Sequence, residues 1–175
     1  QALCLLMVCT GLYATLCLAV VVAPTAVSCD HPHVPKDERI LAFAAADLFY
    51  KKLKKNDGVK IAIQKQIPVA AGLGEGSSNA AAVFLGLNRY YGDPFSMDEL
   101  MSMGLLIGAD VPFFIFGKPA TASGIGEKLK VYTGLKKLKI LLVFPGFSGS
   151  TAAVYKNLNL RLTECNTKLK DSLLD

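Results

Sequence analysis

The sequence lacks several features that mark whole classes of protein. It contains no internal repeat and no low-complexity stretch, and its 175 residues are 52% apolar and only 19% charged. A disordered or collagen-like chain is therefore excluded. The net charge of +5 comes from scattered lysines without a basic stripe interleaved with aromatic residues, so we expect no nucleic acid partner. The length suffices for one domain and part of a second.

The cysteines lack the C-x-x-C spacing of zinc and redox sites, and their number is odd. We therefore expect no disulfide framework, and free, mostly buried thiols in a reducing compartment. His31 and His33 lie in a proline-bracketed loop without a third ligand pattern, so we expect loop residues rather than metal ligands. The five cysteines are Cys4, Cys9, Cys17, Cys29 and Cys165.

The front of the chain lacks charge altogether. Ala2 to Val22 is about as long as the roughly 20 apolar residues that cross a bilayer. Followed by the small residues at 23–26, it could also be a signal peptide with its cleavage zone. No basic residue flanks it, however, and two buried strands joined near Thr10–Tyr13 would have the same composition. We favour the strands, and expect no membrane partner.

The rest of the chain alternates helical and strand-like patterns. We predict a helix from Asp37 to about Lys55, because acidic residues lie at the start of this segment and lysines at its end. Ser96 and Glu99 form a capping box that opens a short helix, which Gly108 ends. The other expected elements are a strand over Val59–Lys65, a helix capped by Ser77, Ser78 or Asn79, and strands at Lys128–Tyr132 and Lys139–Phe144.

A glycine-rich turn from Ala70 to Gly76 links that strand to the serine-capped helix. Glycines let the backbone approach a ligand closely, and N–H groups leading into a helix N-terminus bind anions such as phosphate. The segment is not a Walker A loop, because no Gly-Lys-Ser/Thr follows, and it lacks the third glycine of a dinucleotide fingerprint. Taken alone, it could instead be a glycine-rich connector capped by serine.

Three motifs together narrow this choice. The stretch from Pro68 to Ala81, Pro-x-x-x-Gly-Leu-Gly-x-Gly-Ser-Ser-Asn-Ala-Ala, resembles the phosphate loop of the GHMP small-molecule kinases. Leu106–Phe114 and Ala122–Glu127 add a resemblance to the branch of that family that acts on 4-diphosphocytidyl-2-C-methyl-D-erythritol. The resemblance implies ATP-dependent phosphorylation of the 2-hydroxyl of that substrate in non-mevalonate isoprenoid (terpenoid) biosynthesis.

The resemblance also implies roles for particular residues. Asp110 matches the catalytic aspartate, which accepts or orients the proton of the attacking hydroxyl; the alternative is an N-cap or turn residue. Ser78 is a candidate ligand of Mg²⁺, and Thr151 and Tyr155 match positions that line the cytidine-substrate pocket. The residues implied to bind ATP are Lys65, Pro68, Val69, Ala70, Ala71, Gly72, Leu73, Gly74, Glu75, Gly76, Ser77, Ser78 and Asn79.

The implied fold is α/β (α+β). Residues 1–134 would form the ATP-binding N-terminal domain, of the ribosomal-S5-domain-2-like type and without its first strands. Residues 135–175 would begin an incomplete ferredoxin-like C-terminal domain. We expect a small-molecule kinase of the bacterial cytoplasm or the plastid, a monomer or homodimer.

The sequence also departs from the family pattern. Glu75 replaces a loop glycine, where a carboxylate would repel polyphosphate and any positive φ would strain it. Ile40 replaces an adenine-side asparagine. A lysine motif that partners the aspartate is expected upstream of Gln1, and a second glycine-rich loop beyond Asp175. The alternative is therefore a catalytically incompetent kinase fragment that at most binds nucleotide weakly.

Overall fold

The structure, a computed structural model, describes residues 5–30, 36–64, 72–124, 126–136 and 138–143. Its first sheet contains β2 (Thr15–Val21), β3 (Ala26–Cys29) and β4 (Gly58–Gln64), in the order β2-β4-β3. β4 is antiparallel to β2 and parallel to β3, and helix α1 (Lys36–Leu53) makes the crossover between the two parallel strands. In this register Ile61 pairs with Leu18 on one side and Val27 on the other.

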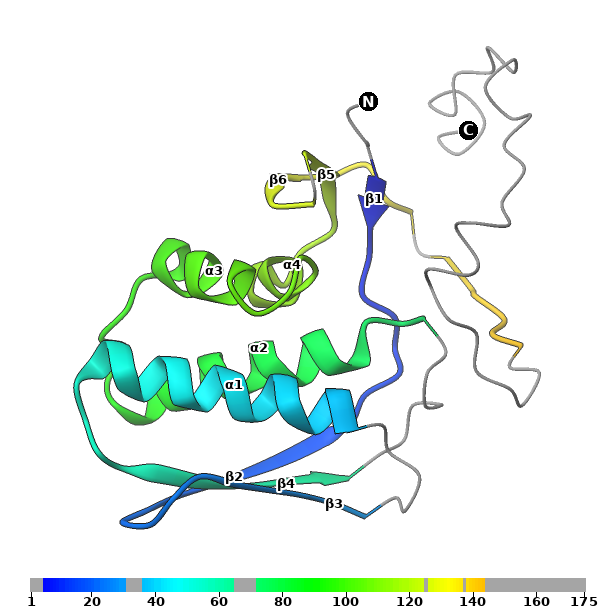
Figure 1. Cartoon of the computed structure of the whole chain (residues 1–175). Helices are drawn as coiled ribbons and strands as arrows, with labels where there is room; N and C mark the ends of the chain where they lie inside the picture. The colour runs from blue at the N-terminus through cyan, green and yellow to red at the C-terminus, as the bar shows by residue number, and fades with distance from the viewer. Residues whose placement is uncertain (1–4, 31–35, 65–71, 125, 137, 144–175) are drawn as a thin grey trace.

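One face of this sheet is covered by α1 and by α2 (Glu75–Tyr90), which lie side by side above it (Figure 1). The alternation predicted for β4 places Val59, Ile61 and Ile63 on the covered face, and all three are buried. The helical spacing predicted for α2 likewise buries one of its faces. The helix residues in this core include Ala42, Ala45, Phe49, Ala80, Val83, Phe84 and Leu87.

Two short helices and a second sheet lie on the other side of α1 and α2 (Figure 1). The helices are α3 (Met97–Leu105) and α4 (Val111–Phe116). The second sheet is antiparallel throughout and has the order β1-β5-β6. Its strands are β1 (Leu5–Met7), β5 (Ala120–Ser123) and β6 (Lys128–Val131). Pairing of β1 with β5 brings the front of the chain beside residues more than a hundred positions later.

Several predicted elements are confirmed. Helix α1 and strand β4 lie where the sequence predicts them, and β6 covers most of Lys128–Tyr132. The capping box of α3 is present: the Glu99 backbone N–H donates to Ser96 Oγ at 3.3 Å, and the Ser96 backbone N–H donates to the Glu99 carboxylate at 2.8 Å. Donation from Ser96 lowers the pKa of Glu99.

The uncharged front of the chain folds as two strands, β1 and β2, joined across residues 8–14. Within the described residues, no helix combines the length and apolarity needed to span a membrane. The expectation that these strands are covered on both faces is wrong, because alternate residues of β2, Thr15, Cys17 and Ala19, are exposed. The helices cover only one face of this sheet, so its outer residues remain in solvent.

Three further expectations are wrong. The described thiols are free but not buried: Cys9 and Cys17 are exposed and Cys29 is half-buried. Residues 139–143 form no strand, since no neighbouring described segment supplies ladder hydrogen bonds. Helix α2 begins at Glu75, so Ser77, Ser78 and Asn79 lie inside its first turns instead of capping it. The sequence pattern also missed β3, α4 and β5.

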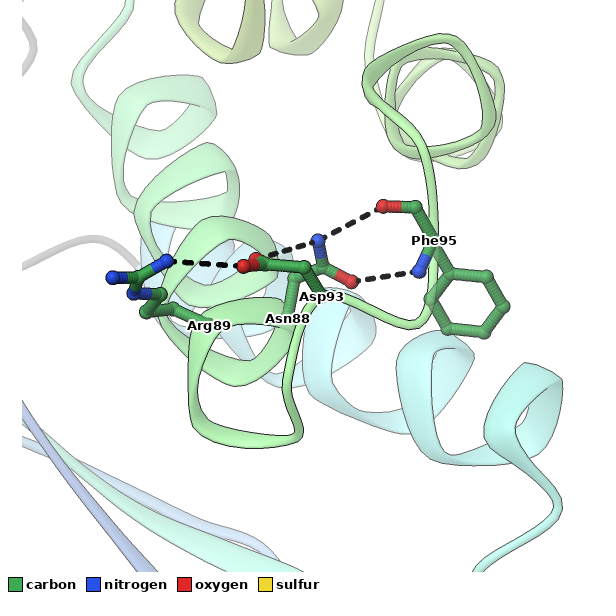
Figure 2. Close-up of polar contacts among 4 residues, drawn as sticks. All are labelled: Asn88, Arg89, Asp93 and Phe95. Carbon is green, nitrogen blue, oxygen red and sulfur yellow. Dashed lines mark hydrogen bonds and ion pairs between the residues drawn. The ribbon is translucent and has the colours of Figure 1, made fainter.

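The turn from α2 to α3 is fixed by a buried asparagine (Figure 2). The side-chain amide of Asn88 donates to the Phe95 carbonyl oxygen at 3.0 Å and accepts from the Phe95 backbone N–H at 3.1 Å. It also donates to Asp93 at 3.3 Å, and the exposed Arg89 pairs with the same carboxylate at 3.1 Å. Asn88 is only 5% exposed, so these bonds satisfy polar groups that water does not reach.

Candidate functional site

A cleft of about 370 Å³ lies where three distant segments of the chain meet. One wall is the connection between β1 and β2, the second is the N-terminal end of α2 with the glycines before it, and the third is the start of α4. Leu6, Met7, Val8, Cys9, Thr10, Leu12, Tyr13, Gly72, Leu73, Gly74, Glu75, Ser78, Asp110, Phe113 and Phe114 line it.

The α2 wall has the form of an anion site. Gly74 is the N-cap of α2, with φ of 69° in the left-handed region, and no side chain caps the helix. The first intrahelical bond runs from the Ser78 backbone N–H to the Gly74 carbonyl oxygen at 2.9 Å. The N–H groups of the turn before it have no partner within the helix, and the positive end of the helix dipole points the same way.

Gly72 opens this wall further. Its φ is 71°, and a Cβ built there would meet no atom within 4 Å. The glycine is thus required by its backbone conformation and leaves open space beside the backbone. A ligand can therefore approach the main chain of this segment closely.

Asp110 stands on the opposite wall. It occupies the N-cap position of α4, as the structural alternative predicts, but its side chain makes no capping hydrogen bond. The reason is local: Pro112, at the second position of the helix, has no N–H to donate, and the backbone of Asp110 is not extended, with φ of −88° and ψ of −15°. The carboxylate is therefore not used for capping, and it lines the cleft.

Glu75 brings a second carboxylate to the cleft wall. As the first residue of α2 its side chain is only 6% exposed. The expected backbone strain is absent, because the positive-φ residues other than glycine in the described chain are Lys54 and Asp93. The expected electrostatic conflict remains, since an anion bound at this helix end would lie near the carboxylate.

The structure gathers only part of the predicted site. Gly72, Leu73, Gly74, Glu75 and Ser78 share the cleft with Asp110, whereas Gly76, Ser77 and Asn79 do not line it. The Asn79 side chain is 1% exposed, and its amide nitrogen has no hydrogen-bond partner among the residues that the structure describes. The predicted site positions that lie outside the described residues are Lys65, Pro68, Val69, Ala70, Ala71, Thr151 and Tyr155. His31, His33 and the side chain of Ile40 also lie outside them.

Sequence reasoning missed the wall formed by the β1–β2 connection, from Leu6 to Tyr13, and the two aromatic residues Phe113 and Phe114. Nothing in the apolar front segment marks it as part of a site, because its contribution depends on the long-range pairing of β1 with β5. Phe114 did carry a signal: it follows Asp110 by four residues, which places both on one face of a helix.

Among the described residues no group of three His, Cys, Asp or Glu side chains is arranged to hold a metal ion. The side-chain oxygens of the cleft-lining residues are the carboxylates of Asp110 and Glu75 and the hydroxyls of Thr10, Tyr13 and Ser78. Such hard oxygen donors suit Mg²⁺, which in phosphate-transferring sites is held by few protein ligands together with the substrate phosphates.

Comparison with known proteins identifies the family. The sequence pattern described as the GHMP kinases N terminal domain matches residues 40–118, which include α2 and Asp110. The chain belongs to the GHMP kinases. The mixed α/β fold predicted from the sequence is confirmed by this match.

The similar sequences are named 4-diphosphocytidyl-2-C-methyl-D-erythritol kinase. The protein from Geobacter sp. (strain M21) is 47% identical over 134 residues, which cover 77% of this chain and 48% of that protein. The protein from Clostridium perfringens is 48% identical over 137 residues, which cover 77% of this chain and 46% of that protein. A solved structure of a 4-(cytidine 5'-diphospho)-2C-methyl-D-erythritol kinase superposes with a TM-score of 0.57 at 34% identity, over 79% of this chain and 49% of that one. The chain thus spans about half the length of the relatives it matches.

Proposed function

We propose that this GHMP kinase chain takes part in the ATP-dependent phosphorylation of the 2-hydroxyl of 4-diphosphocytidyl-2-C-methyl-D-erythritol, a step of non-mevalonate isoprenoid biosynthesis. The observation that carries the proposal is one cleft with an anion-binding helix end on one wall and a carboxylate not used for capping, that of Asp110, on another. The substrate class comes from relatives of that name at 45–48% identity.

The cleft supports phosphoryl transfer in the following way. Backbone N–H groups of the first turn of α2 and the glycines before it would hold the ATP phosphates. The substrate hydroxyl oxygen attacks the γ-phosphorus, the bond from that phosphorus to the β-bridging oxygen breaks, and ADP leaves. Asp110 accepts the hydroxyl proton. Most of the remaining catalysis is positioning and neutralisation of charge.

Mg²⁺, when bound with ATP, would neutralise phosphate charge, and the Ser78 hydroxyl on the cleft wall is the ligand we propose for it. Lys65 and the segment from Pro68 to Ala71 would complete nucleotide binding. Thr151 and Tyr155 would contact the cytidine part of the substrate.

Glu75 favours the alternative of a kinase chain that binds nucleotide only weakly and does not turn over. Its carboxylate belongs to the cleft wall at the very helix end that would receive phosphate. Since like charges repel strongly where water is partly excluded, this single side chain opposes polyphosphate binding.

A thermal-shift titration of the chain with Mg·ATP tests the proposal. A ligand that binds only the folded state stabilises it by about 2.7 kcal/mol at 100 times its Kd, which for a domain of this size raises Tm by about 5–10 °C. Mg²⁺ with adenosine is the matched control, because it has the base and ribose but no phosphate. An equal shift with adenosine would contradict phosphate binding at α2, and no shift with either would leave only the non-binding alternative.

A further inference from the structure

The proposed function requires two separate elements, α2 and α4, to hold their functional ends at a fixed spacing. The main chain of α2 supplies the phosphate donors and α4 supplies Asp110. Apolar contact between the two helix ends contributes to that spacing.

One contact stands out between them. A Cβ built on Gly74 would lie 2.9 Å from Cε2 of Phe114 and 3.0 Å from its Cζ. Real Cβ atoms do not approach other atoms so closely, so the Phe114 ring rests directly on the Cα of the α2 N-cap. Gly74 is therefore required for two independent reasons, its φ of 69° and the ring packed against it.

The ring is itself held in place. The Phe113 side chain is 2% exposed, and its ring meets that of Phe114 at a centroid distance of 5.3 Å and an interplanar angle of 65°. Such an edge contact adds to the apolar burial. Phe114 is therefore a fixed spacer between a buried aromatic on α4 and the backbone of α2.

We infer that Phe114 is a positioning residue, whose ring sets the distance between the phosphate-binding turn of α2 and the carboxylate of Asp110. Asp110 and Phe114 are four residues apart on the same face of α4, and both line the cleft. Any movement of the ring therefore changes the spacing between the two walls. The inference rests on the proposed function for its catalytic consequence, but not for the contact itself.

The consequence for rate follows from geometry. If the ring is removed, α2 and its bound phosphates move together, so ATP binding changes little while the γ-phosphorus is displaced from Asp110. A misplacement of about 1 Å lowers a transfer rate by on the order of a hundredfold. We therefore expect Phe114→Ala to lower kcat tenfold or more and to change the KM for ATP less than about threefold.

Phe116→Ala is the matched control. Phe116 lies on the same helix and is half-buried like Phe114, but it does not line the cleft. Both variants remove the same atoms from α4, so a merely structural role predicts the same loss of Tm and the same kcat for both. Phe114→Leu, which keeps an apolar side chain over Gly74, should recover most of the lost kcat.

Amide hydrogen exchange of the full 175-residue chain provides a test that does not depend on kinase activity. Phe114→Ala should raise exchange at residues 78–81, whose N–H groups make the first helical hydrogen bonds of α2, tenfold or more, whereas Phe116→Ala should leave it near the wild-type rate. Unchanged exchange at 78–81 in Phe114→Ala would overturn the inference, and so would equal losses of kcat in the two variants. If the wild-type chain transfers no phosphoryl group, the proposed function fails, and the exchange result alone decides the positioning role.

A double-mutant cycle covers the case in which Phe114→Ala does not fold. Gly74→Ala introduces the Cβ that meets the ring, and Phe114→Leu gives that Cβ room. The double variant should therefore lose less affinity for Mg·ATP than the product of the two single fold-losses. If the double variant loses affinity by a factor equal to the product of the two single fold-losses, a direct contact between these residues is contradicted.

Discussion

At the scale of single residues, the cleft contains two carboxylates in different settings. Asp110 is at a helix N-cap that gives it no capping hydrogen bond. Glu75 is buried as the first residue of a helix, where the dipole stabilises a negative charge by about 0.3–1 kcal/mol. The same position that suits Glu75 in the free protein is the position where a phosphate anion would bind. We therefore expect Glu75 to stabilise the helix and to weaken phosphate binding.

We predict that Glu75→Gly strengthens Mg·ATP binding. Two unit charges about 10 Å apart at an effective dielectric of about 20 repel by about 1.7 kcal/mol, so the gain in affinity should be on the order of tenfold. Titration calorimetry of the wild type and the variant measures this directly. The residue is not strained in the structure, so relief of backbone strain contributes nothing to the expected gain.

Glu75→Gln separates charge from backbone freedom, because it removes the charge and keeps the side chain. It should give most of the gain seen with Glu75→Gly. Asp98→Asn, which neutralises an exposed carboxylate on α3 that does not line the cleft, should give none. A gain confined to the glycine variant would attribute the effect to the backbone and refute the electrostatic account.

At the scale of elements, α2 contributes both to the hydrophobic core and to the cleft. Its middle packs against α1 and β2, its first turn forms one wall of the cleft, and its last turn holds the chain that leads to α3. Gly86 allows the close approach to β2, since a Cβ there would lie 2.5 Å from a methyl carbon of Leu18.

We predict that Asn88→Ala destabilises the protein by about 1–3 kcal/mol, because it leaves the partly buried backbone N–H and carbonyl of Phe95 without their partners. For a domain of this size the loss corresponds to about 3–10 °C in Tm. Arg89→Ala is the neighbouring control. Arg89 is 84% exposed and its pair with Asp93 is a surface ion pair, which contributes at most about 1 kcal/mol.

Thermal unfolding of both variants, followed by circular dichroism, checks this prediction. Equal Tm values for Asn88→Ala and Arg89→Ala would show that the Asn88 hydrogen bonds of Figure 2 do not stabilise the turn.

The elements also show how far sequence reasoning reaches. Local signals sufficed for α1, β4 and the capping box of α3, because periodicity and caps depend on neighbours in sequence. They failed for the start of α2, where Ser77 and Ser78 have the composition of caps. The left-handed Gly74, four residues before Ser78, begins the helix without any side-chain cap. β3 and β5 are only four residues long, and long-range pairing decides whether such segments become strands.

For the site, the glycine segment and Asp110 could be predicted because their spacing matches a known family. The front segment and Phe114 could not be assigned to the cleft in the same way. Their place depends on the β1–β5 pairing and on the packing of α4 against α2, both contacts between residues far apart in sequence.

At the scale of the whole molecule, the cleft exists because β1 belongs to the second sheet and β2 to the first, so the chain crosses from one to the other. The connection from β1 to β2 then passes beside the ends of α2 and α4 (Figure 1). Three segments far apart in sequence thus enclose one cleft, and each contributes a different chemistry: a largely apolar wall, a helix N-terminus and a carboxylate. This arrangement is consistent with the membership in the GHMP kinases.

The most direct test of the central claim is the rate at which this chain phosphorylates 4-diphosphocytidyl-2-C-methyl-D-erythritol with Mg·ATP, compared with the rate of Asp110→Asn. Product can be followed by phosphorus NMR, which resolves the new phosphate ester. We predict product with the wild type and a loss of about 10²- to 10⁴-fold in kcat for Asp110→Asn, with the affinity for ATP unchanged. Equal rates for the two proteins would contradict the role of Asp110, and absence of product from the wild type would contradict the claim that this cleft performs the transfer.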